Sequence, residues 1–362
     1  MRKTYYTACL LSLALVLVAG RSVAGPKVEI DKDSWMQFGF LGQVHGSSME
    51  NAADKDDIYL RRARIILSGQ MMDGVKFFAE TDNPNAGKNG EPAASTAIQD
   101  AWIDVRLAKH GESSEHWMEA GLILLPFSFE NRATATKLLG IDYNSEAIKL
   151  VNSFVWRDYG ADFHGNLGKK FGYRLGVFDG YDAYSTATLE KNDDAALRYT
   201  GHLACNLIGD VETDWFFTQD RQGAKGNYLS VGVGGDMQDN ATISVSTNPA
   251  AAGIVEDSTA WVVDFQSSFN AGPTVITVNG AYYDWDNASF KGNTTFVEAG
   301  VMVGKVMPTA KYSLTDKDGS DNVQDYTAGL HYFLKGHNAR AGVEYRWGDS
   351  ADWTLVGIQF LL

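Results

Sequence analysis

The sequence of 362 residues is poor in cysteine, proline and positive charge, and it lacks long hydrophobic runs. It holds 2 Cys and no Cys-x-x-Cys-His motif, which excludes a disulfide scaffold and covalently attached c-type haem. Lys and Arg number 31 against 45 Asp and Glu, a formal charge of −14, which excludes a basic nucleic-acid binder. Since no run of eighteen apolar residues occurs, we expect no membrane-spanning helix.

Glycine and aromatic residues, by contrast, are abundant. The chain has 37 Gly, 18 Phe, 16 Tyr and 9 Trp, and 44% of its residues are hydrophobic. Many glycines together with only 7 Pro predict numerous turns and closely packed strands rather than a helical domain.

The N-terminus has the pattern of a secretory signal peptide. Two basic residues precede an apolar stretch at 8–20, and the small residues that follow suit cleavage after Ala24. The apolar stretch is shorter than the ~20 residues that a membrane-spanning helix needs, which disfavours a retained anchor. The signal peptide, residues 1–24, holds three basic and no acidic residues, so the remainder, residues 25–362, has 28 basic and 45 acidic side chains and a formal charge of −17. We therefore expect an exported and markedly acidic protein.

Most of the remaining chain alternates between apolar and polar residues with a period of two, which predicts strands with one apolar and one mixed face. In the segment 98–107, Ile103 and Val105 share one face, whereas Asp104 and Arg106 share the other. The same pattern recurs at residues 35–44, 58–70, 75–82, 173–177, 261–266 and 340–347. The mixed faces carry charges of both signs, and no helical segment is available to cover the apolar faces.

The connections between these segments alternate between short and long. The short ones are residues 71–74, 168–170, 209–210, 236–240, 270–272 and 335–338. The long ones are residues 47–56, 83–95, 126–152, 179–194, 247–257 and 316–325. Tight turns at one rim and long polar loops at the other are typical of a transmembrane up-and-down β-barrel. We therefore predict an all-β fold, an antiparallel barrel of 16 to 18 strands, with 18 from a direct count of the alternating segments.

Closure of the sheet has a physical reason. An unpaired backbone group costs several kcal/mol in hydrocarbon, so a sheet in lipid must have no free edge. A barrel of this size leaves an aqueous lumen, which allows charged inward faces. Aromatic residues near strand ends are then expected in the interfacial girdles, with lumen-facing positions as the alternative, and include Trp102, Trp156, Trp261, Trp285 and Trp347.

Several short motifs occur in order along the chain. They are Tyr59-Leu60-Arg61-Arg62-Ala63-Arg64-Ile65, Gln99-Asp100-Ala101-Trp102-Ile103-Asp104, Glu119-Ala120-Gly121, Pro126-Phe127, Arg157-Asp158-Tyr159-Gly160, Gly176-Val177-Phe178-Asp179-Gly180 and Gly336-His337-Asn338-Ala339-Arg340. As an ordered set they resemble the phosphate-selective porins of the O and P type. The resemblance spans most of the chain and is specific for the family rather than for a solute.

The resemblance implies a trimeric diffusion channel in the outer membrane of a Gram-negative bacterium, narrowed by a loop that folds inward. The connection 126–152 is the candidate constriction loop. In the phosphate-specific members, arginines in the lumen and lysines near the constriction attract the anion. Here the loop carries as many basic as acidic residues, namely Arg132, Lys137 and Lys149 against Glu130, Asp142 and Glu146.

Twelve charged residues are candidates for lining the pore and setting its selectivity. They are Arg62, Arg64, Lys76, Glu80, Asp82, Asp100, Asp104, Arg106, Glu119, Arg132, Lys137 and Arg174. Bidentate arginine suits phosphate, but both Arg62 and Arg64 could instead pair with acidic residues on adjacent strands and order the wall. The balanced loop and the charge of −17 favour a weakly selective pore with some cation preference, so phosphate selectivity stays open.

No catalytic or metal-binding motif stands out. The 7 His are scattered over different segments without zinc-like spacing. Residues 316–321 resemble a calcium loop, but Asp321 stands where a glycine is required, and no later bidentate Glu follows. No Gly-x-Ser-x-Gly elbow occurs. We therefore expect no enzyme, no metal and no cofactor.

The expected partners are small hydrophilic solutes or ions, outer-membrane lipid and further copies of the chain in a homotrimer, with no nucleic acid. Passive diffusion through the lumen is the leading hypothesis. One alternative is a structural barrel that sheathes a multihaem cytochrome in an outer-membrane electron conduit, because such a sheath would look like a porin. Another is a secreted β-rich adhesin or lectin, which would need its apolar face to be covered.

Overall fold

The computed structural model describes residues 25–50, 56–90, 95–111, 113–149, 156–181, 192–210, 226–243, 254–288 and 290–362. The predicted signal peptide, residues 1–24, lies outside these residues. None of the helices in this part of the chain has the length and apolar character needed to cross a membrane. The helical elements described are the short 3-10 turns η1 (Lys88–Gly90) and η2 (Ser145–Ala147).

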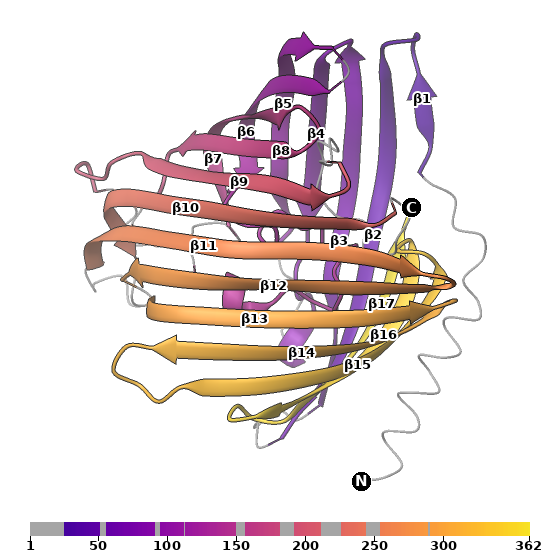
Figure 1. Ribbon diagram of the computed structural model, residues 1–362, viewed down its shortest axis with the longest axis vertical. Coiled ribbons are helices and arrows are strands. Elements are labelled where there is room, and N and C mark those ends of the chain that lie inside the picture. Colours follow the sequence, from indigo (N-terminus) through magenta and orange to yellow (C-terminus); the bar gives the residue numbers. More distant parts are fainter. Residues whose placement is uncertain are drawn as a thin grey trace.

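Sixteen strands close into an antiparallel barrel, and one further short strand, β1 (Lys27–Glu29), lies outside this ring (Figure 1). The barrel strands are β2 (Trp35–Met49), β3 (Asp56–Met72), β4 (Val75–Asp82), β5 (Ala97–His110), β6 (Ser114–Leu124), β7 (Arg157–Leu167), β8 (Phe171–Phe178), β9 (Arg198–Ile208), β10 (Tyr228–Ile243), β11 (Ile254–Ala271), β12 (Thr274–Asn287), β13 (Phe290–Val303), β14 (Val306–Lys317), β15 (Val323–Lys335), β16 (Ala339–Gly348) and β17 (Trp353–Leu361). Each strand pairs with the next along the chain, and β17 closes the ring by pairing with β2. The predicted fold class is confirmed.

The two ends of the described chain share one edge of β2. The C-terminal Leu362 exchanges backbone hydrogen bonds with Phe40, at 2.9 and 3.3 Å. Two residues earlier on β2, the Phe38 amide donates to the Pro26 carbonyl at 3.1 Å, and β1 continues the pairing from there. The edge of β2 that extends past the end of β17 is therefore hydrogen-bonded, as closure requires.

The number of barrel strands is the lower limit of the predicted range, and the count of 18 is too high. The predicted turn at 236–240 is wrong, because β10 runs through it. A register shift between Gln238 and Ala241, with Asn240 at a φ of 51°, absorbs the polar residues as a β-bulge rather than a turn. The predicted turn at 209–210 is instead the start of a long connection to β10, of which residues 211–225 lie outside the described residues.

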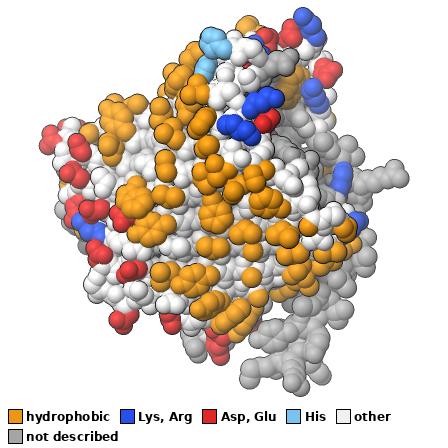
Figure 2. Space-filling model, viewed as in Figure 1, with side chains coloured by type: hydrophobic (Ala, Val, Ile, Leu, Met, Phe, Trp, Pro, Cys, Tyr) orange, Lys and Arg blue, Asp and Glu red, His pale blue; other side chains and the backbone are white. Residues whose placement is uncertain are grey.

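The barrel is apolar outside and polar inside. On β5, Ile103 and Val105 are exposed, whereas Asp100 and Asp104 on the other face are fully buried. Figure 2 shows the outcome on one side of the molecule, where hydrophobic side chains cover the strands and acidic side chains gather at one end of them. The alternation along each strand is therefore the alternation between the outer surface and the lumen.

The interior also holds a large hydrophobic cluster. Trp102, Trp156 and Trp285 are each at most 5% exposed and belong to it, together with Phe127 from the connection after β6. The rings of Phe127 and Trp285 lie 5.5 Å apart. The expected girdle position is therefore wrong for these three tryptophans, and the lumen-facing alternative holds for them.

The alternation of side chains along each strand explains which tryptophans point inward. Trp102 lies between the inward-facing Asp100 and Asp104, so it must point into the barrel as well. Trp261 and Trp347 have the opposite parity and lie exposed on the outer face, where Trp347 stacks on neighbouring tyrosines.

Candidate functional site

Residues 125–149, hereafter the inner segment, leave the end of β6 and fold into the barrel. They reach β14, halfway round the ring of sixteen strands, and in Figure 1 η2 lies behind β12 to β14. On one side, the Gln43 side chain of β2 donates to the Ala135 carbonyl at 3.1 Å. On the other, the Thr294 hydroxyl of β13 donates to the Glu146 carbonyl at 2.7 Å. The inner segment therefore spans the lumen from wall to wall.

Two carboxylates of the inner segment form three ion pairs with the wall. Asp142 accepts hydrogen bonds from Arg61 Nε at 2.5 Å and from Arg62 Nη2 at 3.0 Å, both on β3. Glu146 accepts a hydrogen bond from Lys311 Nζ of β14 at 2.8 Å. The carboxylates belong to the inner segment and the cations belong to the wall, so charge alone ties the segment to two sides of the barrel.

The backbone of the inner segment adds a third attachment, at β16. The Arg340 guanidinium donates to the Leu138 carbonyl at 2.6 Å and to the Gly140 carbonyl at 3.0 Å. Glu344 accepts the Ile141 amide proton at 2.8 Å through Oε1. These bonds satisfy buried backbone groups of a segment that has almost no regular structure of its own.

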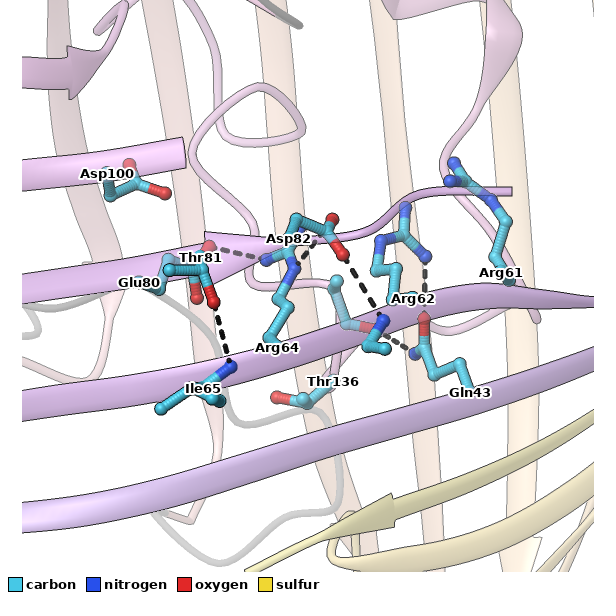
Figure 3. A network of polar contacts seen from close by, with 12 residues as sticks. Gln43, Arg61, Arg62, Arg64, Ile65, Glu80, Thr81, Asp82, Asp100 and Thr136 are labelled. Carbon is cyan, nitrogen blue, oxygen red and sulfur yellow. Dashed lines mark hydrogen bonds and ion pairs between the residues drawn. The ribbon is translucent and has the colours of Figure 1, made fainter. Parts of the chain in front are cut away.

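A β-bulge explains why two consecutive arginines bind the same carboxylate. The register of β2 and β3 pairs Gln43 with Arg62 and then Val44 with Leu60, so Arg61 is the extra residue. Arg62 reaches back to Gln43 Oε1 at 2.7 Å, as Figure 3 shows, while Arg61 turns to Asp142. Strict alternation would have sent Arg61 to the lipid face.

The anchoring carboxylates are ionised at neutral pH. Burial would raise the pKa of Asp142, but the guanidinium groups of Arg62 and Arg61 outweigh it and hold that pKa well below its usual range. Burial would likewise raise the pKa of Glu146, but the ion pair and hydrogen bond with Lys311 lower it. For Arg132 of the inner segment, burial lowers the pKa to about 10, which still leaves the guanidinium charged.

These shifts predict how the attachment responds to acid. A carboxylate whose pKa is lowered by folding contributes stability above its unfolded pKa of about 4, and loses it only as the pH falls through the lower folded value. We therefore expect the single-channel conductance to show no change attributable to release of the inner segment between pH 7 and about pH 4.5, and to rise only in stronger acid. Conductance steps recorded in planar bilayers across this range test it, and a release centred near pH 6 would contradict it.

A cavity of about 240 Å³ lies between the inner segment and the wall of β13 to β17. Three cations and three carboxylates line it, namely Arg61, Lys311, Arg346, Asp142, Glu298 and Glu344. Two of the cations are held by the inner segment, as described above. The lining is therefore balanced in charge, and Arg61, Asp142 and Lys311 are held in ion pairs.

Arg346 differs from the other two cations of the cavity. Within the described part of the chain it has no carboxylate within ion-pair distance, and its Nε atom is buried without a hydrogen-bond partner. Its guanidinium lies 5.3 Å from the ring centroid of Trp353, which also lines the cavity. Arg346 is therefore the cavity cation with the most charge left to act on a passing ion.

Four of the twelve candidate residues come together in one network on the wall of β3 to β5 (Figure 3). Arg64 donates to Glu80 at 2.6 Å and to Asp82 at 3.0 Å, and all three side chains are at most 7% exposed. Asp100 binds Arg157 of β7 at 2.8 Å, and that guanidinium lies 3.7 Å from Glu80. None of the four lines the cavity. Arg64 pairs with carboxylates of the adjacent strand, whereas Arg157 reaches Asp100 from two strands away.

A second group of candidates meets on β5 to β8. Arg174 donates to Glu119 at 3.2 Å and to Asp162 at 2.7 Å. Asp104 contacts His164 at 3.0 Å. Arg132 comes from the inner segment, donates to the Leu124 carbonyl at 3.1 Å and lies 4.0 Å from Glu119.

Three candidates lie apart from both groups. Lys76 Nζ lies 4.2 Å from the ring centroid of Trp117, and the Arg106 guanidinium lies 5.6 Å from the same centroid. Arg106 also binds Asp73 at the short-turn rim. Lys137 is half-buried in the inner segment and has no ion-pair partner among the described residues.

The cavity is lined by charged residues that are not among the twelve candidates. Lys311 and Arg346 lie on inward faces in the last third of the chain. The alternation of residues 340–347 already separated Glu344 and Arg346 from the apolar face, so this signal was available. Arg61 had no such signal, because its position depends on the bulge.

The chain is similar to known proteins in sequence and in fold. Residues 38–249 match the family model of phosphate-selective porin O and P. No curated protein sequence matches the chain.

Solved structures share the fold at low sequence identity. OmpTΔL8, a loop-deletion mutant of the Vibrio cholerae outer membrane protein OmpT, is 11% identical, with a TM-score of 0.60 over 91% of this chain and 100% of that one. Salmonella typhi OmpF is 12% identical, with a TM-score of 0.60 over 93% and 100%. A triple mutant of the Rhodopseudomonas blastica porin is 14% identical, with a TM-score of 0.53 over 90% and 100%. At these identities the likeness is one of fold.

Proposed function

Since this chain belongs to the phosphate-selective porin O and P family and is a channel of the Gram-negative outer membrane, we propose that its inner segment, residues 125–149, is the constriction past which small hydrophilic solutes and ions diffuse. The observation that supports this proposal is the attachment of the segment to β3, β14 and β16 inside the barrel, where it borders a charged cavity. A fixed loop lined by charges acts on ions at close quarters.

The alternative functions find no support. A sheath around a cytochrome needs an interior free for the partner, but here the chain's own inner segment and its aromatic cluster occupy it. A soluble adhesin needs a covered apolar face, whereas Ile103, Val263 and Leu330 are exposed outside.

The proposed channel is weakly selective. The cavity lining holds equal numbers of cations and carboxylates, and Arg62 and Arg64 are engaged with carboxylates rather than open to an incoming anion. A strong phosphate trap needs several unpaired cations facing the path. The test is single-channel conductance and the reversal potential under a salt gradient. We expect a stable open state with a small reversal potential, and a phosphate-saturable current would overturn the weak selectivity.

Arg346 is expected to set what anion preference the channel has. The substitution Arg346→Gln removes the cavity cation that lacks a carboxylate partner, so the cation-to-anion permeability ratio should rise. A unit charge about 6 Å from an ion in water contributes about 0.7 kcal/mol, which corresponds to roughly a threefold change in that ratio. The reversal potential in a KCl gradient measures it.

Arg106→Gln is the matched control for this prediction. It removes the same charge from a residue that binds Asp73 at the rim, away from the cavity. Its reversal potential should stay close to that of the wild type. Equal shifts in both variants would mean that net charge, and not the cavity, governs selectivity.

The channel is also proposed to be a homotrimer whose outer faces contact membrane lipid. Support comes from the Vibrio cholerae OmpT structure, which is described as a trimer form, and from the apolar outer surface of this chain. Native mass spectrometry of the detergent-solubilised protein should give three chains per particle. A particle with a single chain would contradict the trimer and leave the channel proposal standing.

A further inference from the structure

Three side chains of metal-ligand type converge on the inner wall, outside the cavity. Asp104 on β5, Glu119 on β6 and His164 on β7 each place one ligand atom within 4.8 Å of the other two. His164 Nε2 lies 3.0 Å from Asp104 Oδ1 and 3.9 Å from Glu119 Oε2. All three residues are buried.

The sheet register brings like charges side by side around this cluster. Asp104 pairs directly with Glu119, and Glu119 pairs directly with Asp162, so three carboxylates stand in a row on adjacent strands. Like charges in directly opposite positions destabilise a sheet unless cations compensate them. Arg174 compensates Glu119 and Asp162, to which it donates hydrogen bonds.

Asp104 also has cations nearby, but one of its oxygens accepts no hydrogen bond from the described residues. Lys76 is its partner in the register of β4 and β5, with its ammonium group over the ring of Trp117, and Arg132 of the inner segment lies 4.0 Å from Glu119. The second oxygen of Asp104, Oδ2, is buried and has no hydrogen-bond partner among the described residues. A buried carboxylate oxygen without a partner is costly, and a bound cation would remove that cost.

The distances fit a small divalent ion. Zinc bonds to nitrogen and oxygen of about 2.0–2.2 Å in a tetrahedral site correspond to ligand atoms roughly 3.3–3.6 Å apart. The two separations from His164, 3.0 and 3.9 Å, lie on either side of this range, and the two carboxylate ligand atoms lie within 4.8 Å of each other. Side-chain movements of about 1 Å would complete the site. One imidazole nitrogen with two carboxylate oxygens suits borderline divalent ions of the first transition row.

We propose that Asp104, Glu119 and His164 form a binding site for a divalent transition-metal ion on the inner wall of the barrel. The two carboxylates neutralise the ion, and the bond from Arg174 to Glu119 orients one ligand from outside the site. The bound ion would link three adjacent strands next to Arg132 of the inner segment. This site is independent of the proposed diffusion path and was not expected from the spacing of the histidines.

Equilibrium dialysis of the folded, detergent-solubilised full chain against Zn²⁺ tests the proposal. We expect one Zn²⁺ per chain, with an affinity reduced at least roughly tenfold in His164→Gln and in Glu119→Gln. His202→Gln is the matched control, because His202 Nε2 lies 2.9 Å from Asp264 Oδ1 in a similar buried pair that has no third ligand among the described residues. The control should bind Zn²⁺ like the wild type.

X-ray absorption of the wild-type zinc complex keeps the proposal testable even if a variant fails to fold. The expected shell has one imidazole nitrogen and otherwise oxygen ligands. Absence of binding by the folded wild type, binding unchanged in folded His164→Gln, or a shell of oxygen alone would each overturn the proposal. These experiments measure zinc binding and not conductance. Their result therefore does not depend on whether the chain is a diffusion channel.

Discussion

Replacing Asp142 by Asn is expected to free the inner segment from β3 and to raise the single-channel conductance. The substitution removes the carboxylate that Arg61 and Arg62 share, and it leaves the Arg62 side chain, only 3% exposed, with a charge that Gln43 alone cannot balance. Breaking a buried ion pair by removing one partner costs about 3–5 kcal/mol. The remaining attachments include the ion pair with Lys311 at β14, the contact of Arg132 with Glu119 at β6, and hydrogen bonds at β2, β11, β13, β16 and β17. They hold other parts of the segment, so we expect the part around Asp142 to move away from β3.

Planar-bilayer recordings measure the effect as larger and more variable current steps. Asp318→Asn is the matched control, because it makes the same chemical change at an exposed position in the connection between β14 and β15. That variant should conduct like the wild type. If Asp142→Asn gives wild-type conductance while remaining folded, the inner segment does not limit the current and the proposed constriction is wrong.

Replacing Arg64 by Ala is expected to destabilise the barrel strongly with little change in ion selectivity. The substitution leaves Glu80 and Asp82 buried without the guanidinium that binds both of them. The cost of such uncompensated charge is about 3–5 kcal/mol. Because Arg64 does not line the cavity, the reversal potential of the channels that do form should be unchanged.

Samples of Arg64→Ala are heated to a series of temperatures before electrophoresis, and the temperature at which the folded form disappears from the gel is measured. The reversal potential is recorded separately. Arg106→Ala provides the control, since its ion pair with Asp73 lies at the rim, where that carboxylate is largely exposed and the pair contributes little. A stable Arg64→Ala barrel with altered selectivity would reverse the assignment, making Arg64 part of the conduction path rather than of the wall.

The histidine pairs illustrate how far spacing along the chain can predict a site. His164 is separated from Asp104 and Glu119 by tens of residues, and no motif links them. Only the pairing of β5 with β6 and of β6 with β7 brings the three to one level of the wall. Sequence spacing could therefore exclude a local zinc motif, but it could not exclude a site built across strands.

The aromatic residues also show that the sequence pattern does not reveal contacts between distant segments. Parity along β5 was enough to place Trp102 on the same face as Asp100 and Asp104. The Trp102 ring stacks on that of Phe78 on β4, with centroids 5.4 Å apart, and the cluster that holds both also includes Phe127 of the inner segment. This packing comes from residues far apart in the sequence.

The sequence by itself determined the exported, acidic barrel, because a period of two divides residues between lipid and lumen wherever the chain is extended. It also determined the family and the loop most suited to fold inward. Only the tertiary structure decided which charges pair within the wall and which line the cavity. The bulge at Arg61, the strand that runs through 236–240 and the pairing of Arg64 with Glu80 all depend on register, and register is a property of two strands that no single stretch of sequence contains.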